Sequence, residues 1–371
     1  MAVCHPDASP TTLERCIGTL FGLAIGDALG APVEGWPRET IRTACGFIRD
    51  YQYTILGRGV VTDDTQMALA LAESLVQEGH FDPEHFSFAL GEWMRRHDMG
   101  IEAARGASKT VTLTTRALYK GVHWTETGQP SASNVPAVRV APLALFHLHS
   151  PEADLLHDVE DSCLPTNIDP LAIAGAKVMA LAIRALIRSD HGKFHTASFL
   201  DYLELHARHF SPRLADALLP LRDYLCQTPL EEQEFGVPVG GYLHPELQQD
   251  LLSDMSDKFE ILGKIGTGKF VLESIPAALY CFLCTPANFE STVTTAVNAG
   301  GDTDSIAAMA GALSGAFNGS SGIPGRFLRE LEHRERLMNY ATQLCDLAEK
   351  EEHSEPTKWS LTVQVTKIRR G

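Results

Sequence analysis

Oxygen-bearing side chains are concentrated in three short segments that lie far apart in this 371-residue sequence. They are Glu34, the tetrapeptide TDDT at 62–65 and the tetrapeptide DTDS at 302–305. Oxygen ligands without histidine or cysteine are those that Mg²⁺, Mn²⁺ and Ca²⁺ prefer. Many carboxylates packed together would also repel one another strongly without a cation. The pattern therefore predicts that the three segments meet around metal, as in a two-metal hydrolase.

Taken one at a time, each segment also has a purely structural interpretation. Thr62 and the two aspartates after it precede an apolar helix, where such side chains commonly cap free N–H groups. Asp302 or Asp304 could likewise cap the helix that follows them, and Glu34 could be an ordinary surface glutamate. Two aspartates around one threonine exceed what a cap needs, and the coincidence of all three segments favours a metal centre.

Glycines stand beside these segments, at positions where the backbone must approach a ligand or another part of the chain. Gly26 and Gly30 end the first long helical pattern, and a pair of glycines at 300–301 leads into the second pair of aspartates. Glycine tolerates the backbone conformations that such close approaches need. Asp27 is interpreted as a buried cap or a supporting group rather than as a metal ligand.

Helical periodicity dominates the rest of the sequence, and the alternation typical of strands is nearly absent. Apolar residues recur at three-and-four spacing over the ranges 13–29, 65–77, 83–97, 170–188, 199–209, 212–225, 274–283, 289–297, 304–317 and 326–349. This pattern predicts an all-α fold. No fixed-period repeat or linker divides the chain, so a single domain is predicted over residues 1–349, with loops at 125–136 and 230–245. Residues 350–371 are predicted to form a charged peripheral tail.

The composition excludes some classes of function. A hydrophobic content of 44% allows a large core, and a net charge of −16 argues against non-specific binding to nucleic acid or to an anionic membrane. The N-terminus lacks the pattern of a signal peptide, and no apolar run is expected to span a bilayer, so a cytoplasmic protein is predicted. The eight cysteines lack zinc-type spacing. Cys281 and Cys284 are interpreted as buried thiols one helical turn apart.

Several of these stretches together resemble one known family. They are GLAIGDALGAPVE at 22–34, the TDDT helix start, VPAVRVAPLAL at 135–145, IPAALYCFL at 275–283, AVNAGGDTDSIAAMAGALSGAFNG at 296–319 and GIP at 322–324. In this order they are similar to the ADP-ribosylglycohydrolase family, which includes the dinitrogenase-reductase-activating glycohydrolase and the animal ADP-ribosyl-acceptor hydrolases. The resemblance runs from about Leu13 to Pro324. It implies a compact orthogonal bundle of helices and an enzyme that removes ADP-ribose from a modified protein side chain.

The resemblance also implies a binuclear centre that holds two Mg²⁺ or Mn²⁺ ions. The ligands of one ion would be Thr62, Asp63, Asp64 and Asp304, and those of the other would be Glu34, Asp302, Asp304 and Ser305. Asp304 would therefore bridge the two ions. Ser305 stands where the family more often has threonine, and the substitution keeps the hydroxyl group. Every ligand position of the family pattern is filled.

The chemistry expected of such a centre is hydrolysis of an N- or O-glycosidic bond at the anomeric carbon, through an oxocarbenium-like transition state. Bound metal can lower the pKa of an attacking water from ~16 toward ~7, and a nearby carboxylate then takes the proton. Asp302 is the first choice for that base and Asp304 the second. Glu34 completes the set of predicted catalytic residues.

The sequence departs from the family pattern on the substrate side. The glycine-rich loop that wraps ADP-ribose in relatives is replaced by SNVPAVR at 133–139, and the usual threonine-histidine pair is Thr166-Asn167. Lys109 lies in the stretch that corresponds to a glycine-rich phosphate-binding segment, where it is expected to hold a diphosphate as a point charge. The predicted substrate-binding residues are Gly106, Lys109, Ser131, Ser133, Asn134 and Gly268.

The predicted partner is therefore ADP-ribose or an ADP-ribosylated protein, with an altered acceptor or nucleotide preference. Two alternatives stay open: hydrolysis of another ribosylated substrate, such as a metabolite or nucleic acid, and a non-catalytic ADP-ribose-binding or immunity protein. The segment 263–269 also fits the GxxxxGK pattern of a P-loop, but Phe270 follows where serine or threonine is required and no apolar strand precedes it. We expect this segment to be a loop that lines the substrate site.

Overall fold

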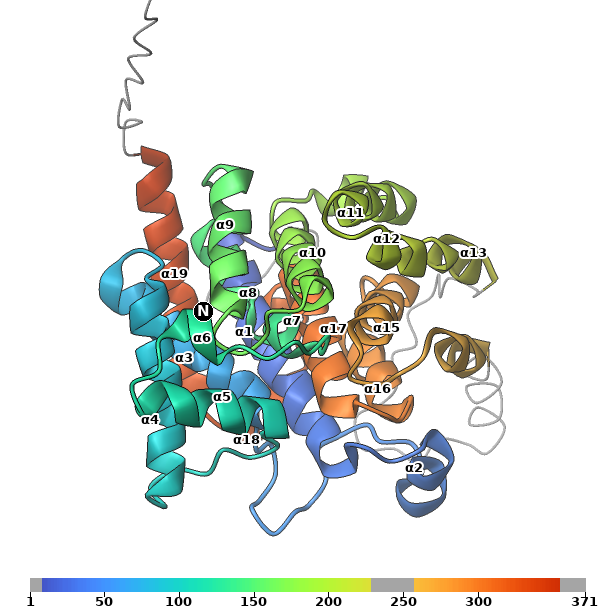
Figure 1. The fold of residues 1–371 in the computed structure, drawn as a ribbon. Helices are drawn as coiled ribbons and strands as arrows, with labels where there is room; N and C mark the ends of the chain where they lie inside the picture. The colour runs from blue at the N-terminus through green and yellow to red at the C-terminus, as the bar shows by residue number, and fades with distance from the viewer. Residues whose placement is uncertain (1–8, 228–256, 354–371) are drawn as a thin grey trace, which may run out of the picture.

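Helices form the regular structure of this chain in a computed structural model that describes residues 9–227 and 257–353 (Figure 1). The α-helices are α1 (Thr12–Gly30), α2 (Arg38–Cys45), α3 (Asp63–Glu78), α4 (Pro83–Asp98), α5 (Lys109–Tyr119), α6 (Trp124–Thr127), α7 (Val135–Arg139), α8 (Ala141–Phe146), α9 (Glu152–Cys163), α10 (Pro170–Ile187), α11 (Thr196–Phe210), α12 (Pro212–Leu218), α13 (Pro220–Gln227), α15 (Val271–Cys284), α16 (Phe289–Asn298), α17 (Thr303–Asn318), α18 (Gly325–Glu330) and α19 (Arg334–His353). Short 3₁₀ helices are η1 (Ala31–Val33), η2 (His191–Lys193) and η3 (Ser320–Gly322), and residues 257–265 are also helical. The predicted all-α class is confirmed, since the described residues contain isolated β-bridges but no strand.

Differences from the predicted helices arise where a local backbone feature interrupts an apolar pattern. The range 212–225 is two helices, α12 and α13, which meet at Pro220. Proline lacks the N–H that would continue the first helix. The range 326–349 is likewise divided into α18 and α19 around His333, which has a φ of 59°. The predicted loop 125–136 overlaps two short helices, the end of α6 and the start of α7. The predicted loop 230–245, and the tail beyond residue 353, lie outside the described residues.

The centre of the molecule is the pair of helices α1 and α17, whose backbones touch along a row of small residues. Gly18, Gly22, Gly26 and Gly30 recur at every fourth position of α1, so they share one face of the helix. A Cβ atom at Gly26 would lie 1.9 Å from the carbonyl oxygen of Ala307 in α17, and one at Gly22 would lie 2.0 Å from that of Gly311. At the end of the row Gly30 packs against Thr303 and Asp304. The close approach therefore brings the end of α1 to the start of α17.

Other helices enclose this pair. α10, α15 and α16 pack against α17, and α19, α3 and α8 pack against α1, so both central helices are surrounded (Figure 1). Every residue of α17 from Thr303 to Asn318 is buried. A helix that is apolar on all sides is typical of the interior of a large protein. The C-terminal ends of α1 and η1 and the N-terminal ends of α3 and α17 gather at one end of this core.

The prediction that no apolar run could span a bilayer was wrong on length and hydropathy. Thr12–Val33 and Pro170–Ile187 both pass as candidate membrane spans, but 83% and 78% of their apolar windows are buried inside the protein. These segments are α1 with η1, and α10. Their apolar residues pack in the core described above. A buried core helix can meet the same criteria of length and composition as a membrane span.

Candidate active site

The first turn of α3 is capped from another helix. The Asp27 carboxylate of α1 accepts hydrogen bonds from the Thr62 N–H at 2.9 Å, the Thr65 N–H at 3.2 Å and the Thr65 hydroxyl at 2.5 Å. Burial raises the pKa of Asp27, and these donors oppose that rise. The Thr62 hydroxyl accepts a further bond from the Asp64 N–H at 3.3 Å. Because Asp27, Thr62 and the Arg105 carbonyl satisfy the free N–H groups, Asp63 and Asp64 are not needed as caps.

The first turn of α17 is not capped by the carboxylate of its N-cap residue, Asp302. Asp302 Oδ2 instead accepts a hydrogen bond from Asn134 Nδ2 at 2.6 Å, while Oδ1 is buried without a hydrogen-bond partner among the described residues. Asp304 Oδ1 accepts from the Ser305 N–H at 2.9 Å. The capping interpretation therefore fails for Asp302, and a buried carboxylate oxygen without a donor is costly unless it binds something.

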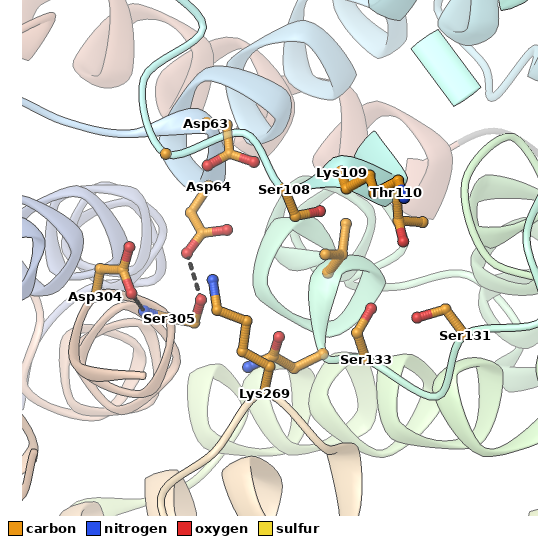
Figure 2. A pocket seen from close by; sticks show the side chains of 13 residues that line it. Asp63, Asp64, Ser108, Lys109, Thr110, Ser131, Ser133, Lys269, Asp304 and Ser305 are labelled. Carbon is orange, nitrogen blue, oxygen red and sulfur yellow. Dashed lines mark hydrogen bonds between the residues drawn. The ribbon is translucent and has the colours of Figure 1, made fainter. Parts of the chain in front are cut away.

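The three acidic segments meet at this point. One carboxylate oxygen each from Glu34, Asp302 and Asp304 lies within 4.8 Å of the other two. The Ser305 hydroxyl donates to Asp64 Oδ2 at 2.8 Å and so joins α17 to α3. Figure 2 shows Asp63, Asp64, Asp304 and Ser305 around one space, with the Lys269 side chain reaching into it. We call this group of Glu34, Thr62, Asp63, Asp64, Asp302, Asp304 and Ser305 the acidic centre.

The electrostatics of the acidic centre favour a bound cation. Burial raises the pKa of Asp63 to about 8, with Asp27 and Glu34 adding to the rise. Burial and the neighbouring carboxylates also raise the pKa of Asp64 and of Asp304 well above the usual range. Groups that resist ionisation in this way are stabilised as carboxylates by a divalent cation. An all-oxygen donor set, in which Asp302 Oδ1 has no hydrogen bond from any described residue, fits Mg²⁺ or Mn²⁺.

A pocket of about 280 Å³ opens from the acidic centre. It is lined by residues of α3, α5, α7, α17 and three loops, namely Asp63, Asp64, Gly106, Ser108, Lys109, Thr110, Ser131, Ser133, Asn134, Val135, Lys269, Asp304 and Ser305. All predicted substrate-binding residues except Gly268 are among them. The Gly268 N–H donates to Glu273 Oε2 at 2.9 Å, and the next residue, Lys269, forms the wall in its place.

Lys269 is the residue that the sequence reasoning missed. Its ammonium nitrogen lies 2.5 Å from Glu34 Oε1 and 3.6 Å from Asp302 Oδ1. Burial alone would lower the pKa of Lys269, but Asp302 and Glu34 raise it above its ordinary value. The available signal was the lysine at the end of the GxxxxGK match, which was set aside together with the P-loop.

The substituted segment 133–139 forms the short helix α7 and the turn before it. Pro136 occupies the first turn of α7, where its missing N–H would have no partner in the helix anyway. The side-chain amide of Asn167 donates to the Ser131 carbonyl at 2.9 Å and to the Ser133 hydroxyl at 3.0 Å. The residues that replace the family's glycines and histidine thus hold this wall of the pocket together.

Gly106 forms the opposite wall next to the acidic centre. It has a φ of +77°, and a Cβ atom there would lie 2.9 Å from Asp63 Oδ1. The Asp63 N–H also donates to the Arg105 carbonyl at 2.6 Å. Glycine is therefore required at this position both by the backbone conformation and by the space beside the carboxylate.

Paired carboxylates beside a polar pocket are the groups that most enzymes cleaving a glycosidic bond use, so the all-α fold and this site agree with a glycohydrolase. The model of the ADP-ribosylglycohydrolase family matches residues 8–354, and the chain belongs to that family.

Similar proteins agree with this assignment. An uncharacterized protein of Archaeoglobus fulgidus is 32% identical over 338 residues, which cover 90% of this chain and 97% of that protein. The ADP-ribosylarginine hydrolase Tri1 of Serratia proteamaculans is 28% identical, over 92% of this chain and 81% of its own length. The solved structure of an ADP-ribosylglycohydrolase-related protein complex is similar with a TM-score of 0.67 at 27% identity, covering 91% of this chain and 99% of that one. Family and relatives support an ADP-ribosyl hydrolase activity.

Proposed function

We propose that this protein hydrolyses the glycosidic bond between ADP-ribose and a modified protein side chain, with two Mg²⁺ or Mn²⁺ ions in the acidic centre. The observation that carries the proposal is the convergence of the buried Asp302 carboxylate with Glu34 and Asp304 next to a polar pocket of about 280 Å³, with Asp302 Oδ1 making no hydrogen bond within the described part of the chain. Membership of the family supports the reaction type. The convergence of oxygen ligands supports the cations.

The proposed ligands divide into two sets. Thr62, Asp63, Asp64 and Asp304 would hold one ion, and Glu34, Asp302, Asp304 and Ser305 would hold the other, with Asp304 shared. When bound, such ions orient the ribose hydroxyl groups and make an attacking water more acidic. The Thr62 hydroxyl already accepts from the Asp64 N–H, and a second lone pair on its oxygen is left for a ligand role.

Asp302 is the proposed general base. The Asn134 amide fixes one carboxylate oxygen at 2.6 Å, which directs the other oxygen, Oδ1, toward the site. The oxygen of water forms the new bond to the anomeric carbon as the bond to the protein side chain breaks. Oδ1 of Asp302 accepts the proton of that water and can return it to the departing side chain.

The substrate diphosphate is proposed to lie near the start of α5. Lys109 is the first residue of that helix and lines the pocket beside Ser108 and Thr110. A lysine there supplies a positive charge, and the start of a helix favours an anion. The Asn134 amide is already bonded to Asp302, so Lys109 is the better candidate of the two for gripping the nucleotide.

The test is release of free ADP-ribose from defined conjugates by the purified protein with Mg²⁺ or Mn²⁺. Arginine-linked ADP-ribose comes first, because a relative bears the name ADP-ribosylarginine hydrolase; serine-linked and nucleic-acid-linked ADP-ribose follow. Release from a protein conjugate, abolished by EDTA, is the expected result. Release only from a nucleic-acid or metabolite conjugate would show that the substrate is not a modified protein side chain. Binding of ADP-ribose without any turnover would instead indicate a non-catalytic binding protein.

A further inference from the structure

Lys269 places a positive charge of the protein itself inside the acidic centre. Its ammonium nitrogen contacts Glu34 Oε1 at 2.5 Å and lies 3.6 Å from Asp302 Oδ1, the oxygen without a hydrogen-bond partner among the described residues. Figure 2 shows the same side chain directed into the space between α3 and α17. Two of the carboxylates proposed to bind metal therefore already face a cation.

The backbone around Lys269 is anchored on both sides, so this position is built into the fold. The carbonyl of Lys269 accepts from the Asn134 N–H at 3.0 Å, and the carbonyl of Thr267 accepts from the Asp302 N–H at 2.7 Å. The Gly268 N–H is held by Glu273 at 2.9 Å. A loop tied in this way keeps the Cα of Lys269 in place, and only the side chain is free to move.

The Lys269 side chain has room to withdraw. It is 50% exposed, whereas the Asp302 side chain is 1% exposed. A lysine has four flexible methylene groups and a strongly hydrated ammonium, so the side chain can withdraw to solvent once its contact with Glu34 is broken. The buried aspartates cannot rearrange in the same way. The lysine is thus the part of the site that gives way when another cation enters.

We propose that Lys269 is a resident cation of the acidic centre, which competes with a divalent metal ion for Glu34 and Asp302. The proposal rests on the cation site in the proposed function, but not on the identity of the substrate. In the metal-free protein the ammonium group neutralises part of the carboxylate cluster. Metal binding requires the Lys269 contact with Glu34 to break, and the positive charge nearby also repels the incoming ion. Lys269 therefore weakens metal affinity and limits occupancy of the centre.

The experiment is calorimetric titration of Mn²⁺ into metal-stripped, full-length protein. Lys269→Met removes the charge and keeps most of the side-chain volume, and we expect it to bind Mn²⁺ at least tenfold more tightly, which is about 1.4 kcal/mol. Lys269→Arg keeps the charge and should bind like the parent. Lys193→Met is the matched control, because Lys193 pairs with Asp190 outside the acidic centre and does not line this pocket; its affinity should also equal that of the parent.

Thermal melting in EDTA gives a second measurement. Lys269→Met should melt at a lower temperature than the parent without metal and should gain more from added Mn²⁺, because its carboxylates lose their resident cation. Lys269→Gln serves the same purpose if the methionine variant does not fold. Equal or weaker Mn²⁺ affinity in a folded, charge-removed variant would overturn the inference alone. Absence of Mn²⁺ binding in both parent and variant would overturn it together with the proposed cation site.

Discussion

The individual residues of the acidic centre differ in what their surroundings leave them free to do. Asp27 is occupied by the donors at the start of α3, and Thr62 also caps that helix. Asp302, by contrast, stands at an N-cap position and does not cap, so its carboxylate is directed toward Asn134 and the pocket. Burial of an oxygen that makes no hydrogen bond among the described residues, with only the Lys269 ammonium 3.6 Å away, is difficult to explain by stability alone. Function is the better explanation for this residue.

Substitution of Asp302 by Asn tests its role as the base. The change keeps the shape of the side chain and removes its charge, so we expect the rate of ADP-ribose release to fall by about 10²–10⁴-fold. The melting temperature of the metal-free protein should be unchanged or higher, because repulsion within the acidic centre is relieved. Asp98→Asn is a suitable control, since Asp98 is an exposed aspartate paired with Arg116. A near-normal rate for Asp302→Asn, or a loss of its metal-free stability, would refute the assignment.

Asp63 gives the metal-free protein a distinctive dependence of stability on pH. Burial raises its pKa in the folded state to about 8, whereas an aspartate in an unfolded chain has a pKa of about 3.9. Between these values the folded state binds more protons, so the free energy of unfolding falls as pH rises. In EDTA the melting temperature should therefore decrease from pH 5 to pH 8. The melting temperature of Asp63→Asn should decrease less over this range. An equal decrease in both proteins would contradict the raised pKa of Asp63.

At the scale of the elements, the α1–α17 contact is what brings the acidic segments together. The row of glycines on α1 packs directly against the backbone of α17, and its last member touches Asp304. Glu34 follows four residues later, after the single turn of η1. A wider spacing between the two helices would move Glu34 away from Asp302. The glycines are thus as important for the site as the carboxylates.

Gly26→Ala tests this packing. The added methyl group would lie 1.9 Å from a backbone oxygen of Ala307, which cannot move aside as a side chain can. Overpacking of this kind typically costs about 1–3 kcal/mol and occasionally more, and we expect the upper part of that range in chemical denaturation. Gly263→Ala is the matched control, because a Cβ there meets no heavy atom within 4 Å. Equal stability of the two variants would show that α1 and α17 are not in close contact.

The sequence predicted the elements well where apolar periodicity was long, as in α1, α3, α10 and α17. It was less successful with short helices such as α7, whose five residues are too few to show a period. The convergence of Asp63, Asp64, Asp302 and Asp304 could be anticipated from their chemistry, because a set of oxygen ligands without histidine or cysteine is suited to a shared metal centre. The place of Lys269 could not, because it depends on hydrogen bonds that the Asn134 and Asp302 N–H groups donate to its loop, and the GxxxxGK match does not reveal these contacts.

At the scale of the whole molecule, segments separated by hundreds of residues form one site at one end of a buried helical core. The enclosing helices fix α1, α3 and α17, while the loops at 106–108 and 131–134 and the loop of Lys269 supply walls of the pocket. The proposed metal ligands therefore lie on the enclosed helices or next to their ends. The segments that depart from the family pattern carry the proposed substrate contacts. This division is consistent with a conserved type of reaction and an altered choice of substrate.

The central claim is that the three acidic segments form a divalent cation centre. Anomalous X-ray diffraction from crystals soaked in Mn²⁺ tests it most directly, because the signal locates the metal without reference to activity. We predict two anomalous peaks. The two Mn²⁺ ions at these peaks should together contact carboxylate oxygens of Asp63, Asp64, Asp302 and Asp304, and the contact between Glu34 and Lys269 should be broken. If crystals soaked in saturating Mn²⁺ showed no anomalous peak at these carboxylates, or showed peaks only elsewhere on the protein, the proposed cation centre would be contradicted.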